Sequence, residues 1–352
     1  MKTLKRTGII FLSIVVVISI TITVLFWNEL RSLSSIKKLD DYGMFQMTYY
    51  GDYGFDDFLA VGAASDSDIE AFVTKRLLKG VPIDLGVTGA GCTVFVTQSE
   101  KGETLFSRNF DFSYAPSLQL FTAPANGYAS VSTVNLTFAG YSEDNLPNGL
   151  SLDSFLTLAA PFLPFDGMNE KGVAIALLAV PEASLENDEE KITLNTTTAI
   201  RLVLDKAASV DEAVALLRQH NIYFSGGINC HFLIADASGK SVLVEYYDGQ
   251  LQTITTEENY QIASNFIAYN GVNIGEGFDE FERYDKVKAA IEINGWLSEA
   301  QSLKLLAEVG VRDGNTDKLQ WSVLYNLTTE NGEIFAHRNA DNTMNFQLDK
   351  SD

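Results

Sequence analysis

The first pattern along the chain is a run of 20 residues, 8–27, without a charged side chain. A helix rises about 1.5 Å per residue, so this run matches the roughly 30 Å hydrocarbon thickness of a bilayer. No small-residue cleavage motif of a signal peptide follows it. A run that is apolar all round also suits lipid better than the packed face of a soluble helix. We therefore predict a single-pass transmembrane signal anchor, with residues 1–7 in the cytoplasm.

Strand-type patterns begin at residue 92. The stretch 92–98 is rich in β-forming residues, 99–102 has the composition of a turn, and 103–110 predicts a second strand. A strand–turn–strand also fits 231–247. The small apolar stretch 172–180 lacks alternation, as expected of a strand that is covered on both faces. These patterns predict a sheet-rich domain over the rest of the chain.

Helix signals occur in two pairs, 196–207 with 209–220 and 281–294 with 298–309. The second helix of each pair opens with a capping-box sequence, Ser209-x-x-Glu212 or Ser298-x-x-Gln301. Strands interleaved with helix pairs predict a layered α+β domain, which we place at residues 92–352. Residues 28–91 are predicted to be a stalk or a pro-segment that covers this domain.

Composition and charge narrow the possible functions. The chain has 25 basic and 46 acidic residues, a net charge of −21, which argues against a nucleic-acid partner because such binding needs basic surface. Two cysteines cannot form a disulfide framework, and three scattered histidines make a poor zinc site. We expect no metal and no cofactor.

Several short segments then follow one another in the order typical of one enzyme family. They are Cys92-Thr93, a glycine turn at Gly102, 107–111 (Ser-Arg-Asn-Phe-Asp), 166–172 (Asp-Gly-Met-Asn-Glu-Lys-Gly), the turn and strand 236–245, Asn265, Arg283 and 321–327 (Trp-Ser-Val-Leu-Tyr-Asn-Leu). Together they resemble the choloylglycine hydrolase, or linear amide C–N hydrolase, family, which includes bile-salt hydrolases and penicillin V acylases. The resemblance covers essentially all of 92–352. It implies a four-layer αββα N-terminal-nucleophile hydrolase sandwich, here preceded by one transmembrane helix.

The chemistry expected of Cys92 depends on its position. A thiol is a good nucleophile only as a thiolate, and an ordinary pKa near 8.5 leaves only about a few per cent ionised at pH 7. If Cys92 is the first residue of a processed chain, its own α-amine, with an ordinary pKa of about 7.7–8.0, can act as the base. Gly91 precedes it, so activity requires a cut at Gly91–Cys92. The related acyl-coenzyme A:6-aminopenicillanate acyltransferases cleave themselves at such a Gly-Cys bond.

The resemblance implies roles for five further residues. Asp111 would orient the α-amine, and Arg108 would lie beside the thiolate. Asn265 would donate an amide N–H to the oxyanion of the tetrahedral intermediate, and the backbone N–H of Ala179 would complete the oxyanion hole. Arg283 would supply positive charge nearby.

Each assignment has a simpler alternative. Cys92 could be a buried small apolar residue, and Arg108 and Asp111 could form a surface pair in a turn. Asn265 could cap a turn, and Arg283 could be a charge on the surface of a helix.

Two further residue groups invite a catalytic interpretation that we do not adopt. Asn169 follows Asp166-Gly167 and is predicted to serve a turn. Cys230 and His231 are neighbours in a predicted strand, so their side chains point to opposite faces, and we reject a Cys–His dyad.

The chain departs from the family pattern at three places. Bile-salt hydrolases begin almost at the nucleophile, whereas 91 residues precede Cys92 here. Ala179 stands where the family often has Asn or Tyr. Only 17 residues separate Asn265 from Arg283, too few for the hairpin that bile-salt hydrolases use in tetramer assembly.

The sequence therefore predicts a membrane-anchored, extracytoplasmic cysteine amidohydrolase. It would cleave a small linear N-acyl amide through a thioester on Cys92, after autoproteolysis at Gly91–Cys92. One alternative is an acyltransferase of the same fold, in which an amine takes the acyl group in place of water. Another is an uncleaved, non-catalytic module that binds at a surface.

Overall fold

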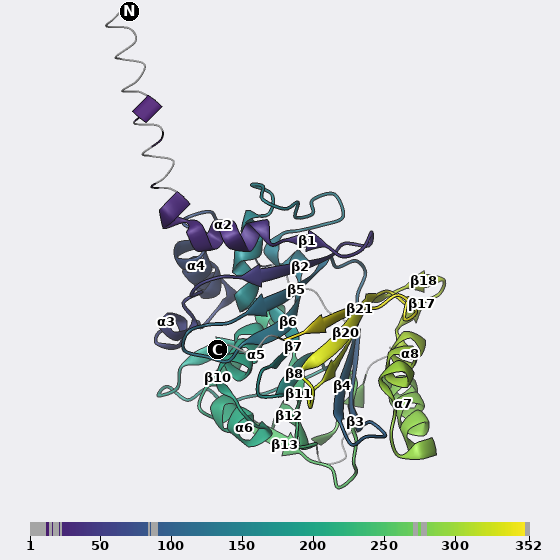
Figure 1. Ribbon diagram of the computed structural model, residues 1–352. Coiled ribbons are helices and arrows are strands. Elements are labelled where there is room, and N and C mark those ends of the chain that lie inside the picture. Colours follow the sequence, from purple (N-terminus) through teal and green to yellow (C-terminus); the bar gives the residue numbers. More distant parts are fainter. Residues whose placement is uncertain are drawn as a thin grey trace, which may run out of the picture.

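The computed structural model describes residues 12–13, 16, 21, 23–83, 85, 91–269, 274–275 and 280–348. Within these ranges two β-sheets pack face to face, and a pair of helices covers the outer face of each sheet (Figure 1). The layers are, in order, helices, a nine-stranded sheet, a six-stranded sheet and helices. This is the αββα order that the sequence predicts.

The larger sheet is antiparallel throughout except for the parallel pair β2–β5. Its strands lie in the order β1 (Lys37–Lys38), β2 (Met44–Tyr49), β5 (Ser117–Thr122), β6 (Ser130–Asn135), β7 (Pro164–Asn169), β8 (Ala174–Ala179), β11 (Cys230–Ala235), β12 (Ser241–Tyr247) and β13 (Gln250–Ile254). The smaller sheet is fully antiparallel, with the order β14 (Gln261–Ala263), β3 (Gly91–Gln98), β4 (Thr104–Asp111), β19 (Leu319–Asn326), β20 (Asn331–Ala336) and β21 (Met344–Gln347).

Strand alternation decides which side chains of β3 face the larger sheet. Successive side chains of a strand point to opposite faces. Cys92, Val94 and Val96 belong to the main core, which includes the larger sheet, whereas Phe95 packs in a second core with α7 and α8. Cys92 therefore faces the layer between the two sheets.

The covering helices match the two predicted pairs. α5 (Thr196–Lys206) and α6 (Val210–Arg218) lie on the larger sheet, and α7 (Glu280–Asn294) and α8 (Glu299–Val309) lie on the smaller one. Ser298 and Gln301 form the complete predicted capping box of α8. The box of α6 is half formed, because the Glu212 carboxylate accepts from the N–H of Ala208 and not from that of Ser209.

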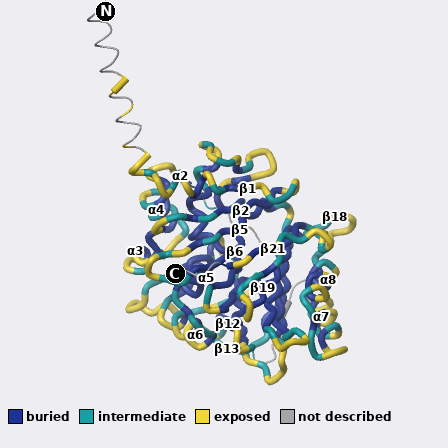
Figure 2. The backbone as a smooth tube through the Cα atoms, in the orientation of Figure 1, coloured by how far each residue is buried: buried dark blue, intermediate teal, exposed yellow. Residues whose placement is uncertain are grey.

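Short elements complete the domain. They are the 3-10 helices η1 (Leu136–Ala139), η2 (Phe155–Phe162) and η3 (Ser225–Gly227), and the two-stranded pairs β9 (Thr193–Asn195) with β10 (Asn221–Tyr223), β15 (Phe266–Ile267) with β16 (Ile274–Gly275), and β17 (Arg312–Asp313) with β18 (Thr316–Asp317). Figure 2 shows that burial is continuous through the two sheets, whereas exposed residues gather on the outer helices and in the loops.

The segment before Cys92 takes part in this fold. It contains α2 (Trp27–Ser34), β1, β2, α3 (Phe55–Leu59) and α4 (Asp66–Arg76), and β2 lies between β1 and β5 in the larger sheet. Met47 of β2 and Phe58 of α3 are completely buried in the main core. The described part of this segment, which we predicted to be a stalk or a pro-segment, is thus packed against the domain.

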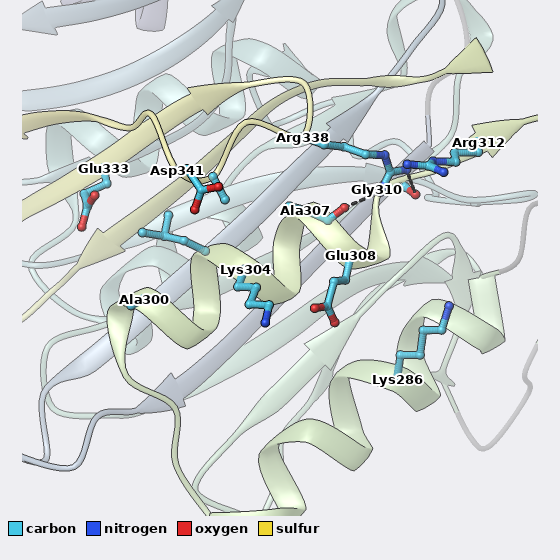
Figure 3. A pocket seen from close by; sticks show the side chains of 12 residues that line it. Lys286, Ala300, Lys304, Ala307, Glu308, Gly310, Arg312, Glu333, Arg338 and Asp341 are labelled. Carbon is cyan, nitrogen blue, oxygen red and sulfur yellow. Dashed lines mark hydrogen bonds between the residues drawn. The ribbon is translucent and has the colours of Figure 1, made fainter. Parts of the chain in front are cut away.

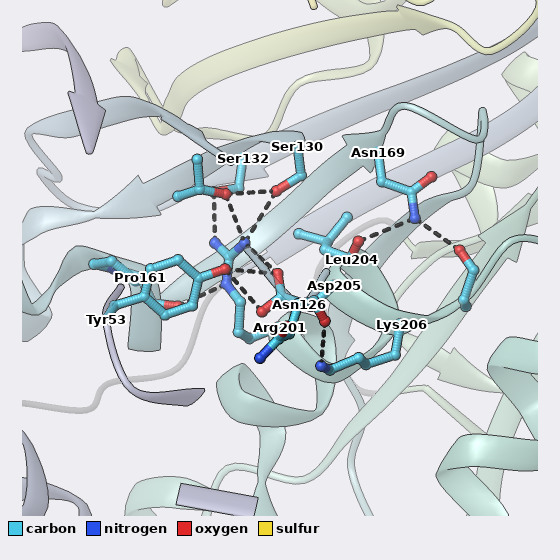
Figure 4. A network of polar contacts seen from close by, with 12 residues as sticks. Tyr53, Asn126, Ser130, Ser132, Pro161, Asn169, Arg201, Leu204, Asp205 and Lys206 are labelled. Carbon is cyan, nitrogen blue, oxygen red and sulfur yellow. Dashed lines mark hydrogen bonds and ion pairs between the residues drawn. The ribbon is translucent and has the colours of Figure 1, made fainter. Parts of the chain in front are cut away.

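A buried polar network joins the same segment to α5 (Figure 4). The hydroxyl of Tyr53 donates to the carboxylate of Asp205, 2.8 Å from each oxygen, and Arg201 Nη1 lies 3.3 Å from Asp205 Oδ1. Arg201 also donates to the carbonyl of Pro161 and to the hydroxyl of Ser130. Buried charges are costly unless they are paired and hydrogen-bonded, so Tyr53 helps to satisfy the ion pair of α5.

One part of the predicted fold class is corrected. No helix within the described residues has the length and apolar character that a bilayer crossing requires. The longest helix with described bounds, α7, has 15 residues, several of them charged, whereas a crossing takes about 20 apolar residues. The predicted span over 8–27 lies mostly outside the described residues. The transmembrane helix and the membrane partner are therefore not supported, and the extracytoplasmic location stays a prediction.

Candidate active site

Cys92 lies one residue inside the first strand of the smaller sheet and is completely buried. The β3–β4 register places it opposite Phe110, and Val94 opposite Arg108. Arg108 therefore projects from the same face of the sheet, two positions along from Cys92. Its Nη2 atom lies 3.7 Å from Cys92 Sγ.

The Arg108 guanidinium is held by residues of both sheets. Its Nη1 atom is 2.9 Å from Asp166 Oδ2, and both side chains are fully buried. Asp166 belongs to β7 and also accepts hydrogen bonds from Tyr325 Oη (2.6 Å) and Trp321 Nε1 (3.3 Å) of β19. Sequence reasoning assigned no role to Asp166, although an acidic residue in a stretch of buried apolar residues is a signal that could have drawn attention to it.

Asn265 lies between Cys92 and the larger sheet. Its Oδ1 atom accepts from the backbone N–H of Cys92 (2.7 Å) and from Arg283 Nη2 (3.0 Å). Its Nδ2 atom donates to the carbonyl oxygen of Ala179 (2.8 Å). Two donors on one side and an acceptor on the other fix the orientation of the amide. Nδ2 carries a second hydrogen that this contact does not use.

Arg283 reaches the site from α7 on the outer face of the smaller sheet. Its Nη1 atom donates to the carbonyl oxygen of Cys92 and to the hydroxyl of Thr93, both at 2.5 Å. The residue is 4% exposed, so the helix-surface position considered for it is not observed. Two guanidinium groups and one side-chain amide thus converge on the backbone and side chain of Cys92.

Asp111 faces the position that would be cut. It lies opposite Gly91 in the β3–β4 register, and a side chain at Gly91 would place its Cβ only 3.3 Å from the Cβ of Asp111. Asp111 Oδ1 accepts from the N–H of Val311 (2.7 Å), whereas Oδ2 is buried without a hydrogen-bond partner among the described residues. Asp111 as a whole residue is 1% exposed. The alternative that it lies in a turn at the surface is therefore not observed.

In the uncut chain, burial has the largest effect on the pKa values of the Cys92 thiol and the Asp111 carboxyl. It raises the pKa of the Cys92 thiol to about 11, although Arg108, Arg283 and the backbone N–H of Ala179 act in the opposite direction. Burial also raises the pKa of Asp111 to about 6, against the effect of Arg283 and the hydrogen bond from Val311. The thiol of the uncut chain is therefore protonated at neutral pH.

Asp111 should make the stability of the uncut chain depend on pH. Its pKa is about 6 in the fold and about 3.9 in an unfolded chain. Because the folded value is the higher one, the contribution of Asp111 to stability is fully present below about pH 4 and is lost as the pH rises through about 6. Above that pH, Asp111→Asn should stabilise the non-cleaving Cys92→Ala protein by at most about 3 kcal/mol.

Denaturant unfolding of Cys92→Ala and of Cys92→Ala/Asp111→Asn, measured from pH 4 to pH 7.5, tests this expectation. The difference between the two unfolding free energies should grow with pH. A difference that is constant across the range would show that Asp111 is not perturbed in the fold.

The second cysteine, Cys230, lies on β11 of the larger sheet, next to the strand β8 that ends at Ala179. Cys230 is opposite Ala179 in the β8–β11 register, and its thiol donates to the carbonyl of Ile228 (3.3 Å). His231 instead contacts Glu245 and Ser264. The two neighbours thus use different partners, as alternation in a strand predicts.

Asn169 has the turn role that the sequence predicts. Its Oδ1 accepts from the N–H groups of Lys171 and Val173. Its Nδ2 donates to the carbonyls of Leu204 on α5 and of Ala207, the residue after this helix. Within the described ranges, no group of three or more His, Cys, Asp or Glu side chains is arranged to hold a metal ion.

A cavity of about 990 Å³ lies elsewhere, between α8 and the end of the chain around β20 and the loop that follows it. Figure 3 shows Arg338 on its wall, reaching the carbonyls of Ala307 and Gly310 at the end of the helix, with Lys304 and Glu308 nearby. None of the predicted site residues lines this cavity. Gly310 and Arg312 line the cavity, and Val311 between them donates its N–H to Asp111.

Comparison with known proteins matches the sequence, over residues 92–286, to the family described as linear amide C–N hydrolases, choloylglycine hydrolase family. The chain is 33% identical over 111 residues to penicillin V acylase of Pectobacterium atrosepticum, which covers 28% of this chain and 29% of that protein. It is 27% identical over 217 residues to bile salt hydrolase/transferase of Clostridium perfringens, which covers 57% of this chain and 64% of that protein. The chain thus spans less than two thirds of the length of these relatives.

A solved structure supports the fold. A crystal structure of a variant of conjugated bile acid hydrolase from Clostridium perfringens superposes with a TM-score of 0.52 and 19% identity, over 73% of this chain and 92% of that one. The likeness supports the layered α+β fold described above.

Proposed function

Since the chain belongs to the choloylglycine hydrolase family of linear amide C–N hydrolases, we propose that it hydrolyses a small N-acyl amide through a thioester on Cys92. The observation that carries this proposal is the convergence of Arg108, Asn265 and Arg283 on one buried cysteine. The family match also begins at residue 92, which supports Cys92 as the first residue of the active chain. No cofactor takes part.

The proposed maturation step is a cut at Gly91–Cys92 by the chain itself. Cys92 Sγ attacks the carbonyl carbon of Gly91, the C–N bond breaks, and the nitrogen takes the proton. Water then hydrolyses the resulting thioester, which leaves a Gly91 carboxylate and a free α-amine on Cys92. Arg108 and Arg283, which lower the pKa of the thiol against the effect of burial, favour the thiolate needed for this attack. Asp111, opposite Gly91, is suited to hold the new ammonium group.

Turnover then uses the new amine as a base. It accepts the thiol proton while Sγ attacks the acyl carbon of the substrate. The N–H of Ala179 and the free hydrogen of Asn265 Nδ2 would stabilise the oxyanion. The ammonium passes its proton to the leaving amine as the C–N bond breaks. Water, deprotonated by the same amine, releases the carboxylic acid and restores the thiol.

Intact-mass measurement and N-terminal sequencing of purified protein test the proposal. We expect a chain that begins at Cys92, together with the fragment that ends at Gly91. This preparation should release the coloured amine from an N-acyl p-nitroanilide, and penicillin V and a conjugated bile salt extend the substrate set. An active preparation with an intact Gly91–Cys92 bond would contradict the maturation step. An intact bond without turnover would favour a non-catalytic binding module.

Acyl transfer is the second candidate, because the Clostridium perfringens relative is named as a hydrolase and transferase. In that case an added primary amine takes the acyl group from the Cys92 thioester in place of water. Adding glycine to the assay and separating the products by mass spectrometry distinguishes the two. Transfer predicts N-acyl glycine as a major product, whereas hydrolysis predicts only the free acid.

A further inference from the structure

Two buried ionisable side chains, His231 and Glu245, contact the chain on either side of Asn265. They have no role in the reaction described above. His231 is on β11 and Glu245 on the adjacent strand β12, and they are 1% and 2% exposed. His231 Nδ1 lies 2.9 Å from Glu245 Oε1. Both belong to the larger sheet, whereas Asn265 follows β14 of the smaller sheet.

The pair binds the chain on both sides of Asn265. On one side, His231 Nε2 lies 3.0 Å from the carbonyl oxygen of Ser264. On the other side, Glu245 accepts from the backbone N–H groups of Ala268 and Tyr269, at 2.9 Å each. The six residues 264–269, with Asn265 near one end, are thus held against β11 and β12.

The carboxylate of Glu245 is held by three donors. A carboxylate can only accept, so it accepts from His231 Nδ1 and from the two backbone N–H groups. Burial opposes ionisation of Glu245, but His231 and the two backbone N–H groups outweigh it and lower the pKa of Glu245. The contact is therefore a charge-assisted hydrogen bond, which is stronger than a neutral one.

The two proposed oxyanion donors, Ala179 and Asn265, lie on different sheets, and the His231–Glu245 pair connects these sheets. Ala179 ends β8, which neighbours β11 in the larger sheet, whereas Asn265 belongs to a segment of the smaller sheet. Ser264 also donates from its hydroxyl to the carbonyl of Cys92 (3.2 Å). A link between the Asn265 segment and the larger sheet therefore sets the distances among Ala179, Asn265 and Cys92.

We propose that Glu245 and His231 are positioning residues that hold Asn265 at the correct distance from the Ala179 N–H and from Cys92 Sγ. This inference rests on the proposed function. Donors are effective when they lie about 2.7–3.1 Å from the position that the developing oxyanion occupies. A misplacement of about 1 Å can cost roughly 10²-fold in rate. The pair acts on the transition state through Asn265 and does not touch the substrate.

The test is the Glu245→Gln variant, which keeps the size of the side chain and removes its charge. We expect kcat to fall about 10- to 100-fold with little change in KM, because the loss concerns the transition state. Rates on an N-acyl p-nitroanilide are divided by the fraction of chains that begin at Cys92, so that slow maturation does not mimic slow turnover.

A double-mutant cycle separates positioning from a general structural effect. If Glu245 acts through Asn265, then Glu245→Gln should cost less than about 2-fold when Asn265→Ala is already present. The matched control is Asp236→Asn in the same β11–β12 hairpin. Asp236 is also buried, but among the described residues its carboxylate accepts only from Val210 and Ser238. Its variant should keep the parent kcat.

Three outcomes would overturn the inference. One is an equal loss of kcat from Glu245→Gln with and without Asn265→Ala. The second is a parent-like kcat in both Glu245→Gln and His231→Gln, which serves as the second variant. The third is failure of both variants to fold, which would leave a purely structural role. The proposed function fails differently, since then Asn265→Ala or Cys92→Ala would itself keep the parent rate.

Discussion

The Cys92→Ala protein should remain full length and should hydrolyse no amide. The sulfur that contacts Arg108 would be absent, so neither the attack on Gly91 nor the attack on a substrate can occur. Cys92→Ser should cut slowly, since a hydroxyl is a poorer nucleophile than a thiol. Intact mass reports the cut, and amine release from an N-acyl p-nitroanilide reports turnover.

The chain supplies a matched control for this substitution. Cys230, its other cysteine, is also free and buried and lies opposite Ala179. Cys230→Ala removes a thiol of equal size from the same region, and the protein should still cut and turn over. Cleavage at Gly91–Cys92 in the Cys92→Ala protein would mean that another agent makes the cut.

Asn265→Ala should lower kcat by about 10²–10³-fold, or roughly 2.7–4 kcal/mol, the usual cost of removing an oxyanion donor. The same change removes the acceptor for the Cys92 N–H and for Arg283, so maturation should also slow. Asn265→Asp separates these effects, because it keeps the acceptor oxygen and loses the donor. It should mature faster than Asn265→Ala and still turn over slowly.

These rates are best measured in the full chain after maturation. A shortened protein that starts at residue 92 would lack β2, an internal strand of the larger sheet, and its activity would mix catalytic and folding effects. Ala179→Gly serves as the control, since only its backbone N–H is proposed to act. A kcat of Asn265→Ala close to that of the parent would leave Asn265 with a turn-capping role alone.

Local signals explain why the helices and the β3–β4 hairpin could be predicted. A capping residue acts on backbone three positions away, and Ser298 with Gln301 forms the predicted box. The parallel pairing of β2 with β5 has no local signal. Gln46 bonds Gln119 across 73 positions, and no composition or periodicity near residue 46 indicates this partner.

The residues of the site also differ in whether a local sequence signal predicts their position. Cys92 and Arg108 share a face because of alternation and hairpin register, both of which can be read from a short stretch of sequence. Asn265 and Arg283 followed only from the family resemblance. Asp166, His231 and Glu245 were missed, because they contact the site from the opposite sheet. Their roles depend on how the two sheets face each other, which sequence spacing does not encode.

The position of β2 changes what the proposed cut would produce. Before the cut, the paired strands β2 and β5 are two segments of one polypeptide. Tyr53, which follows β2, also bonds Asp205 of α5 within the same chain. After the cut, β2 and β5 form an interface between two separate molecules, so their association obeys the law of mass action. Dilution would then lower the fraction of the mature enzyme in which the two chains are associated. Refolding after denaturation would become a second-order reaction, whereas the precursor folds as one chain.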